Sequence, residues 1–261
     1  GVLGSQTQVR VRGAEANHLV VLFDGVEAND PSQGDEFNWA TVTAADIERI
    51  EIIRGPQSSL RGSDAIAGVV NIITPSAEKT SFGFFLESGS RSTHHTGVNL
   101  GLKQPDFDVR LGLANIESNG GNIARLGDEK DGYQNTTLTI KAGAKINEQV
   151  RFSFSARESD GMNQYDADND YDGLVEDQDR QSNFYSSNAR LKVDYSSLDG
   201  LWRHKLSISR STNDSSAFVD GVEGNITASI KDQYQYVGSV SFADGTKTLS
   251  FLAERDREDW E

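Results

Sequence analysis

The side chains best suited to chemistry are the carboxylates of residues 166–179, which read DADNDYDGLVEDQD. Asp168, Asp170 and Asp172 fall at the first, third and fifth positions of an EF-hand type of calcium loop, and a glycine follows at the sixth. Carboxylates this close together repel one another, so a neutralising cation is favoured. We therefore predict calcium as a structural cofactor, with a solvated acidic loop lacking a fixed metal as the alternative. The predicted ligands are Asp166, Asp168, Asp170, Asp172, Asp177 and Asp179.

Sequence motifs of known catalytic centres are absent. The chain has no cysteine nucleophile, and its four histidines do not show the H-E-x-x-H spacing of zinc proteases. His94 and His95 are adjacent in a predicted loop, where solvation is the simpler interpretation. Neither the G-x-S-x-G nor the G-x-x-x-x-G-K-[ST] motif occurs. We predict that the protein is not an enzyme.

Composition narrows the class of protein. The 261 residues carry a formal net charge of −15, which argues against nucleic acid as a partner because phosphates would be repelled. Mean hydropathy is −0.54, and no stretch approaches the roughly 18 to 20 apolar residues that a spanning helix needs. Strands of a transmembrane barrel need only about 9 to 11 residues of alternating character, so a barrel remains compatible with this composition.

Residues 47–74 read as a strand, a glycine-proline turn, a short exposed segment, a second glycine turn and another strand. The first strand alternates Ile with Glu and Arg, and Gly55-Pro56 ends it because proline cannot donate to a ladder. After Gly62 the chain becomes small and apolar up to Ile73, which suits a strand covered on both faces. Pro75 closes this segment.

The residues before this stretch complete a small unit. We predict strands over Gln8–Arg12 and Leu19–Phe23, a polar loop over Ala28–Trp39, and one short helix over Thr41–Ile47 with Thr43 as its N-cap. Residues 1–76 are therefore predicted to form a small α/β domain.

From Ser81 onward the apolar residues alternate strictly with polar ones. Leu111, Ile140 and Phe154 are examples of the apolar series, which we place outward, and no helical period appears. About nine antiparallel strands can be drawn over residues 77–261. A barrel that encloses a small domain has about 22 strands, so these would form part of a larger barrel.

The connections between these strands distinguish a barrel from a soluble sandwich. Short turns at Gln104-Pro105, Asn147-Glu148, Ser196–Gly200 and Asp244-Gly245 alternate with long polar stretches. Short periplasmic turns and long outer loops are typical of outer-membrane barrels. A soluble calcium-binding β-sandwich remains an alternative. The long stretches are Asn119–Gln134, Ser159–Asn183 and Ser211–Gln233.

The motifs of residues 9–74 closely resemble the plug domain of TonB-dependent outer-membrane receptors, and within them the cobalamin-transporter branch. The motifs are RG at Arg12-Gly13, DGV at 24–26, ERIEIIRGP at 48–56 and GSDAIAGVVNIIT at 62–74. The family usually has an aromatic residue at the position of Arg61. Beyond Pro75 the resemblance is looser.

The resemblance implies active uptake of a large, scarce ligand across the bacterial outer membrane. The partners would be outer-membrane lipid, the TonB energy-transducing complex, and a corrinoid or, as runner-up, a ferric siderophore. An adhesin or porin would share the strands without the plug motifs. We expect the secretory signal, the TonB box and the rest of the barrel to lie outside this sequence.

The resemblance also implies roles for particular residues. Polar side chains on the plug loops would bind the ligand, Arg54 would pair with barrel carboxylates, and the calcium site would lie in an outer loop. The predicted ligand-binding residues are Asn29, Asp30, Ser32, Gln33, Gln57, Ser58, Ser59 and Arg61.

Overall fold

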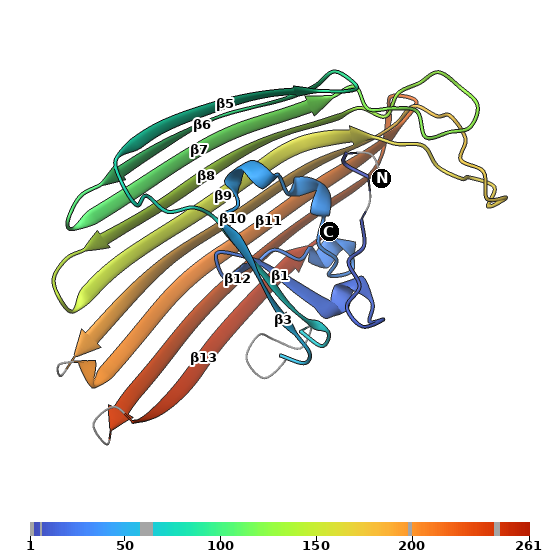
Figure 1. Cartoon of the computed structure of the whole chain (residues 1–261). Helices are drawn as coiled ribbons and strands as arrows, with labels where there is room; N and C mark the ends of the chain where they lie inside the picture. The colour runs from blue at the N-terminus through green and yellow to red at the C-terminus, as the bar shows by residue number, and fades with distance from the viewer. Residues whose placement is uncertain (1–2, 6, 58–64, 198–199, 243–245) are drawn as a thin grey trace.

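The chain folds into a small sheet domain that rests against a large curved sheet (Figure 1). The computed structural model describes residues 3–5, 7–57, 65–197, 200–242 and 246–261. Below, the small domain is called the plug and the large sheet the wall. No helix in these ranges is long and apolar enough to span a membrane.

The plug is built on a four-stranded sheet with the order β2-β1-β4-β3. Strand β1 pairs in parallel with β4, while β2 and β3 pair antiparallel to their neighbours. Every residue of β1 is buried, which explains its uninterrupted LVVLF sequence. The predicted double-sided burial of the last plug strand is also confirmed, because β4 is mostly buried. The strands are β1 (Leu19–Phe23), β2 (Val26–Glu27), β3 (Arg49–Arg54) and β4 (Gly68–Ile73).

Two predictions for the plug are wrong. Residues 8–12 form no strand; Val9 and Val11 pack against the core, and the backbone then turns at Arg12 and Gly13, both with positive φ. The predicted helix over Thr41–Ile47 is replaced by short 3₁₀ turns, because β3 follows at once and leaves no room for a longer helix. The 3₁₀ turns are η1 (Ala16–His18), η2 (Pro31–Gln33), η3 (Trp39–Thr41) and η4 (Ala44–Asp46).

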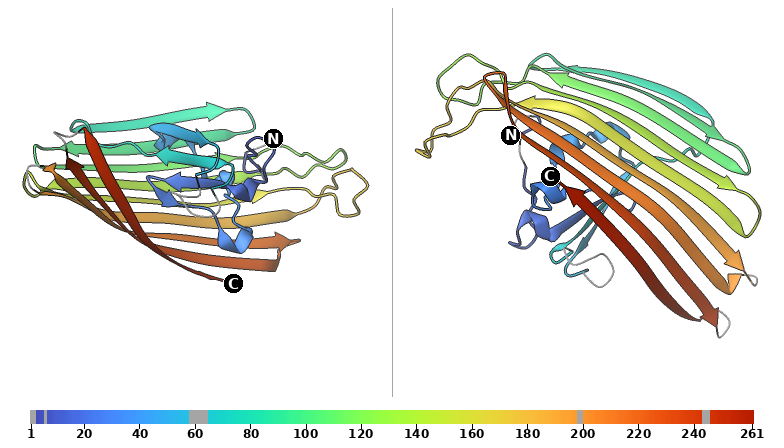
Figure 2. Two further views of the ribbon diagram at one scale, coloured as in Figure 1. Left: turned by 90° about the horizontal axis from the view of Figure 1, so that it is seen from below. Right: turned by 180° about the vertical axis from the view of Figure 1, so that it is seen from behind.

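The wall is a nine-stranded antiparallel meander in which every strand pairs with its neighbours in sequence. It is open, and Figure 2 shows it as a curved sheet with the plug on its concave side. Strand β4 ends at Ile73 and β5 begins at Ser81, so the predicted boundary near residue 76 falls in the link between plug and wall. The wall strands are β5 (Ser81–Gly89), β6 (Thr93–Lys103), β7 (Phe107–Ser118), β8 (Tyr133–Lys145), β9 (Val150–Gln164), β10 (Arg180–Ser197), β11 (Trp202–Val219), β12 (Val222–Phe242) and β13 (Lys247–Trp260).

The two faces of the wall differ in polarity as the alternation predicts. Leu111 and Phe154 expose 38% and 37% of their surface on the convex face, and no described residue covers them. The opposite side chains, such as Thr137 and Ser159, are polar and buried beneath the plug. The wall therefore presents an apolar surface outward and a polar surface to the plug, which is the pattern of a barrel in lipid.

The alternation of short and long connections holds for two of the three long stretches. The loops over 119–132 and 165–179 lie at the same end of the wall, opposite the short turns. The third prediction is wrong: residues 211–233 lie almost entirely in β11 and β12, which meet in a hairpin at Asp220-Gly221. Both turn residues have positive φ, as a type I′ turn requires, and polar side chains do not prevent backbone pairing beyond a membrane.

Candidate functional site

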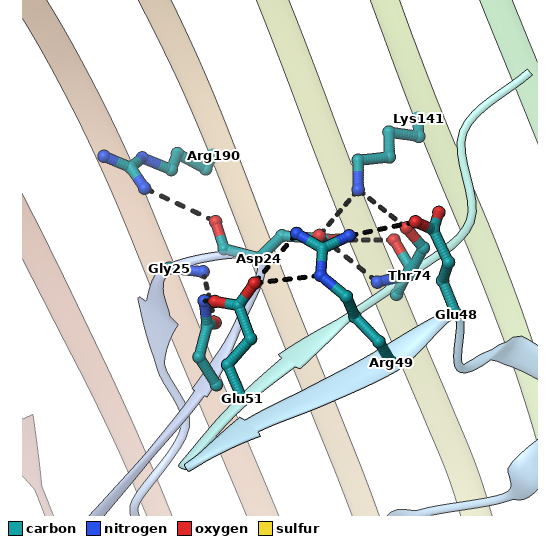
Figure 3. A network of polar contacts seen from close by, with 9 residues as sticks. Asp24, Gly25, Glu48, Arg49, Glu51, Thr74, Lys141 and Arg190 are labelled. Atoms are coloured by element: carbon teal, nitrogen blue, oxygen red, sulfur yellow. Dashed lines mark hydrogen bonds and ion pairs between the residues drawn. The ribbon is translucent and has the colours of Figure 1, made fainter. Parts of the chain in front are cut away.

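Asp24, in the turn after β1, joins the plug to two wall strands (Figure 3). Nζ of Lys141 on β8 donates to Oδ1 of Asp24 and to the carbonyl oxygen of Thr74, both at 2.7 Å. The Thr74 hydroxyl donates to the other oxygen of the Asp24 carboxylate, and Nη1 of Arg190 on β10 donates to the Asp24 carbonyl at 3.4 Å. Asp24 and Thr74 flank the plug sheet, so these contacts fix both of its central strands to the wall.

Arg157 on β9 forms a buried ion pair between wall and plug. Only 2% of its surface is exposed, and its Nε lies 3.0 Å from Oδ2 of Asp46 in the plug. Its Nη2 donates to the Thr41 carbonyl oxygen, and its guanidinium carbon lies 4.4 Å from the ring centroid of Phe23. A buried cation is tolerated only where a counter-charge and hydrogen bonds compensate for lost water, and Asp46 and Thr41 supply both.

Neighbouring wall side chains hold the same plug segment through its backbone. The Tyr133 hydroxyl donates to the carbonyl oxygen of Ala40 at 2.6 Å, and the Ser159 hydroxyl donates to that of Thr41 at 3.1 Å. Asn135 links these two contacts, because its side-chain amide donates to the Ala40 carbonyl oxygen at 3.3 Å and to Ser159 Oγ at 2.8 Å. The 3₁₀ turns leave these carbonyl groups without helical partners, and the wall satisfies them.

A third group of contacts joins the plug to β12. Nζ of Lys231 lies 2.7 Å from a carboxylate oxygen of Glu27 in the plug and 2.7 Å from one of Glu258 on β13. The Ser229 hydroxyl donates to Asp30 at 2.7 Å, and the Gln33 side-chain amide donates to Thr227 at 2.7 Å. The wall therefore holds the plug from β8 across to β12.

These contacts involve some of the residues predicted to bind ligand. Asn29 is buried, and its side chain bonds the backbone of Val21, Leu19 and Asp35. Asp30 accepts from the backbone and hydroxyl of Ser32, and in this way caps η2. The Asn29 side chain therefore has a structural role here.

The remaining predicted ligand-binding residues stay predictions. Gln33 is exposed, and Gln57 is half-buried with its backbone N–H donating to Ala65. Ser58, Ser59 and Arg61 lie outside the described residues.

Arg54 lies exposed at the end of β3. Within the described ranges it forms no ion pair with a wall carboxylate, so its predicted pairing also stays a prediction. The charged partners on this strand are local: Arg49 lies 2.9 Å from Glu48 and 2.9 Å from Glu51 (Figure 3). Water screens exposed pairs of this kind, so they add little to stability.

The two long loops bring carboxylates together in a cluster that the sequence only partly predicts. Oxygens of Glu129, Asp166 and Asp177 lie within 4.8 Å of one another. Burial, followed by the neighbouring carboxylates, raises the pKa of Glu129 to about 7 and also raises that of Asp131. Glu129 Oε2 and Asp131 Oδ1 are buried without a described hydrogen-bond partner. Carboxylate oxygens arranged in this way fit a hard divalent cation such as calcium.

The predicted ligand set divides into separate parts. Asp168, Asp170 and Asp172 form a second, more exposed group within 4.8 Å, at the tip of the loop. Backbone N–H groups of Asp172 and Gly173 already donate to Asp168. Asp179 belongs to neither group. Glu129 was missed because it lies in the preceding loop, where only the local sequence GDEKDG signals further carboxylates.

We predict that Gly120→Ala disrupts this cluster. Gly120 has a φ of +63°, and a Cβ there would lie 1.7 Å from the Asp131 backbone oxygen. The left-handed conformation alone costs a non-glycine residue about 1 to 2 kcal/mol. Proteolysis within residues 119–132 should therefore become faster. Gly224→Ala is the control, because its Cβ would meet its nearest atom at 3.5 Å; equal cleavage of both variants would contradict the prediction.

A plug fixed by buried contacts inside a wall with an apolar outer face defines the class of plugged outer-membrane β-barrel receptors. Residues 1–69 match the family model of the TonB-dependent receptor plug domain. These residues therefore belong to the plug-domain family of the TonB-dependent receptors, which lie in the bacterial outer membrane.

Its relatives in sequence include vitamin B12 transporters. The chain is 31% identical over 223 residues to BtuB of Vibrio vulnificus, covering 77% of this chain and 35% of that protein. It is 30% identical over 176 residues to BtuB of Photobacterium profundum, covering 64% and 28%. The chain thus spans about a third of the length of the curated relatives it matches.

Solved structures agree on the fold. The pyoverdine outer membrane receptor FpvA of Pseudomonas aeruginosa PAO1 superposes with a TM-score of 0.76 at 12% identity, over 96% of this chain and 40% of that one. The ferric-catecholate import receptor Fiu of E. coli K12 gives 0.72 at 12% identity, over 97% and 44%. The predicted fold, a plug followed by part of a larger barrel, is confirmed.

Proposed function

We propose that this chain works in a TonB-dependent transporter that takes up a corrinoid. The observation that supports this most directly is its identity of 31% with a vitamin B12 transporter across both plug and wall. The TonB energy-transducing complex would supply the driving force, since the plug is held by several buried contacts that binding of a small ligand alone is poorly able to break. The match to the plug-domain family supports a receptor role without catalysis.

Calcium is proposed as a structural cofactor of the outer loops. The cluster of Glu129, Asp166 and Asp177 joins residues 119–132 to residues 165–179, so a cation there would hold the two loops together. Asn122 lies beside this cluster: its side-chain amide donates to Asp177 at 2.7 Å, and its side-chain oxygen is buried without a described partner. An amide oxygen is a neutral ligand that calcium accepts alongside carboxylates. Ordered outer loops would in turn shape the ligand entrance.

A ferric siderophore is the second candidate ligand. The solved receptors with this fold include one bound to pyoverdine and one that imports ferric catecholate. Their identity to this chain is only 12%, so they support the fold and carry less weight on the ligand.

A growth assay with the full-length protein tests the proposal. Expressed in a host lacking its own corrinoid receptor, the protein should restore growth on limiting cobalamin, and the same host without TonB should not grow. Rescue of iron-limited growth alone would favour the siderophore as ligand, and rescue of neither would contradict the proposal.

A further inference from the structure

The concave face of the wall near its short turns is strongly basic. The strand register places alternate side chains on this face; Lys141 and Arg190, which contact the plug, identify it. Six further cations on the same face lie closest to the turns and are called the basic track. They are Lys103, Lys145, Arg151, Lys192, Arg203 and Lys205.

Carboxylates do not balance the basic track. On inward strand positions of this half of β6 to β11 the described carboxylates are Asp108 and Asp194. Lys103 and Arg151 share Asp108, at 3.2 and 3.0 Å, and Lys192 lies 2.9 Å from Asp194. Lys145 lies 2.5 Å from Glu148 in the adjoining turn. Among the described residues, the six cations of the track have three carboxylates as ion-pair partners, so a net positive charge remains on this part of a chain whose overall charge is −15.

The plug does not account for these cations. Within the described ranges, the side-chain hydrogen bonds from this half of the wall to the plug come from Lys141 and Arg190, which lie at inward positions farther from the turns. The side chains of Lys103 and Arg151 are 43% and 46% exposed, against 23% for Lys141. The basic track is thus open to solvent on the turn side of the plug.

We propose that the basic track binds the anionic groups of the cargo, phosphate or carboxylate, as it leaves the barrel. This inference rests on the proposed transport function and adds a charge requirement to its substrate. Like charges lining a concave surface raise the local concentration of anions, and Lys and Arg bind phosphate through charge-assisted hydrogen bonds. Several exposed cations in a row offer sites weak enough for release, which passage requires.

Neutralising the track in the full-length receptor tests this. The variant Lys145→Gln/Arg203→Gln/Lys205→Gln is compared with Arg210→Gln/Arg255→Gln/Arg257→Gln, which removes the same charge from the convex face. In energised cells, the track variant should take up a corrinoid with its phosphodiester tail about tenfold more slowly, with surface binding unchanged. Uptake of a corrinoid lacking the phosphate should change little. Equal loss for both corrinoids, weakened surface binding, or no loss would overturn the proposal.

A second measurement does not depend on corrinoid transport. The same full-length proteins are placed in planar bilayers with the plug loosened by urea, and the reversal potential is measured in a KCl gradient. The track variant should shift toward cation selectivity relative to both wild type and the control variant. An unshifted potential would overturn the inference, whereas failed corrinoid uptake by the wild type with a shifted potential would contradict only the proposed function.

Discussion

Asp46→Asn is expected to weaken the attachment of the plug to the wall by about 3 to 5 kcal/mol, the usual cost of removing one partner of a buried ion pair. Asp46 is 7% exposed and Arg157 2% exposed, so water cannot replace the lost carboxylate. Arg157 Nη1 already lacks a described hydrogen-bond partner, so the guanidinium has no other described contact that would compensate for the loss of the Asp46 carboxylate. The urea concentration that releases the plug should fall accordingly, measured by proteolysis of plug residues in the full-length receptor.

Asp232→Asn is the matched control for this prediction. Asp232 pairs with Arg210 at 2.6 Å, but the Arg210 side chain is 60% exposed, so water replaces the contact and the expected loss is about 0 to 1 kcal/mol. A second variant, Asp46→Leu/Arg157→Met, removes both charges and should recover most of the loss. If Asp46→Asn and Asp232→Asn released the plug at the same urea concentration, the buried pair would not be a principal attachment.

The strands of the wall were predictable because the alternation of apolar and polar residues is a property of each strand by itself. Strict alternation over each strand reports which face meets lipid, and Leu111 and Phe154 lie where that rule places them. The motif-rich stretch from Ile47 to Thr74 likewise predicted β3 and β4 closely, since glycine and proline mark their ends. The polar residues 211–233 misled this reasoning, because backbone pairing continues in strands that leave the bilayer.

The contacts between plug and wall were not predictable, because they join residues far apart in sequence. Arg157 reads as one more polar residue of β9 until the fold brings it to Asp46 and Phe23. The alternation along the strand predicts that Arg157 points inward, but it does not predict that Asp46 is its partner. Glu129 and Asp166 illustrate the same limit, since two separate loops must meet before their carboxylates form one cluster.

Calcium is expected to reverse the pH dependence of the outer loops. In chelator, burial and neighbouring carboxylates raise the pKa of Glu129 from 4.5 to about 7. The stabilisation from its protonated form is then complete below pH 4.5 and is lost as the pH rises through about 7. Proteolysis of residues 119–132 and 165–179 should therefore accelerate over this range. With calcium, the ionised carboxylates bind the cation, so protection should increase over the same range.

Calorimetric titration of the full-length receptor measures the same linkage directly. Calcium should bind more tightly at about pH 8 than at about pH 6, with protons released on binding at the lower pH, because binding requires Glu129 to ionise. Glu129→Gln and Asp166→Asn should each weaken binding by at least about tenfold, while Glu223→Gln, exposed in the β11–β12 hairpin, should not. A cation site predicts that the proteolysis rate rises with pH in chelator and falls with pH in calcium. A merely solvated acidic loop would bind no calcium at millimolar concentration, and its proteolysis rate would change with pH in the same way in both buffers.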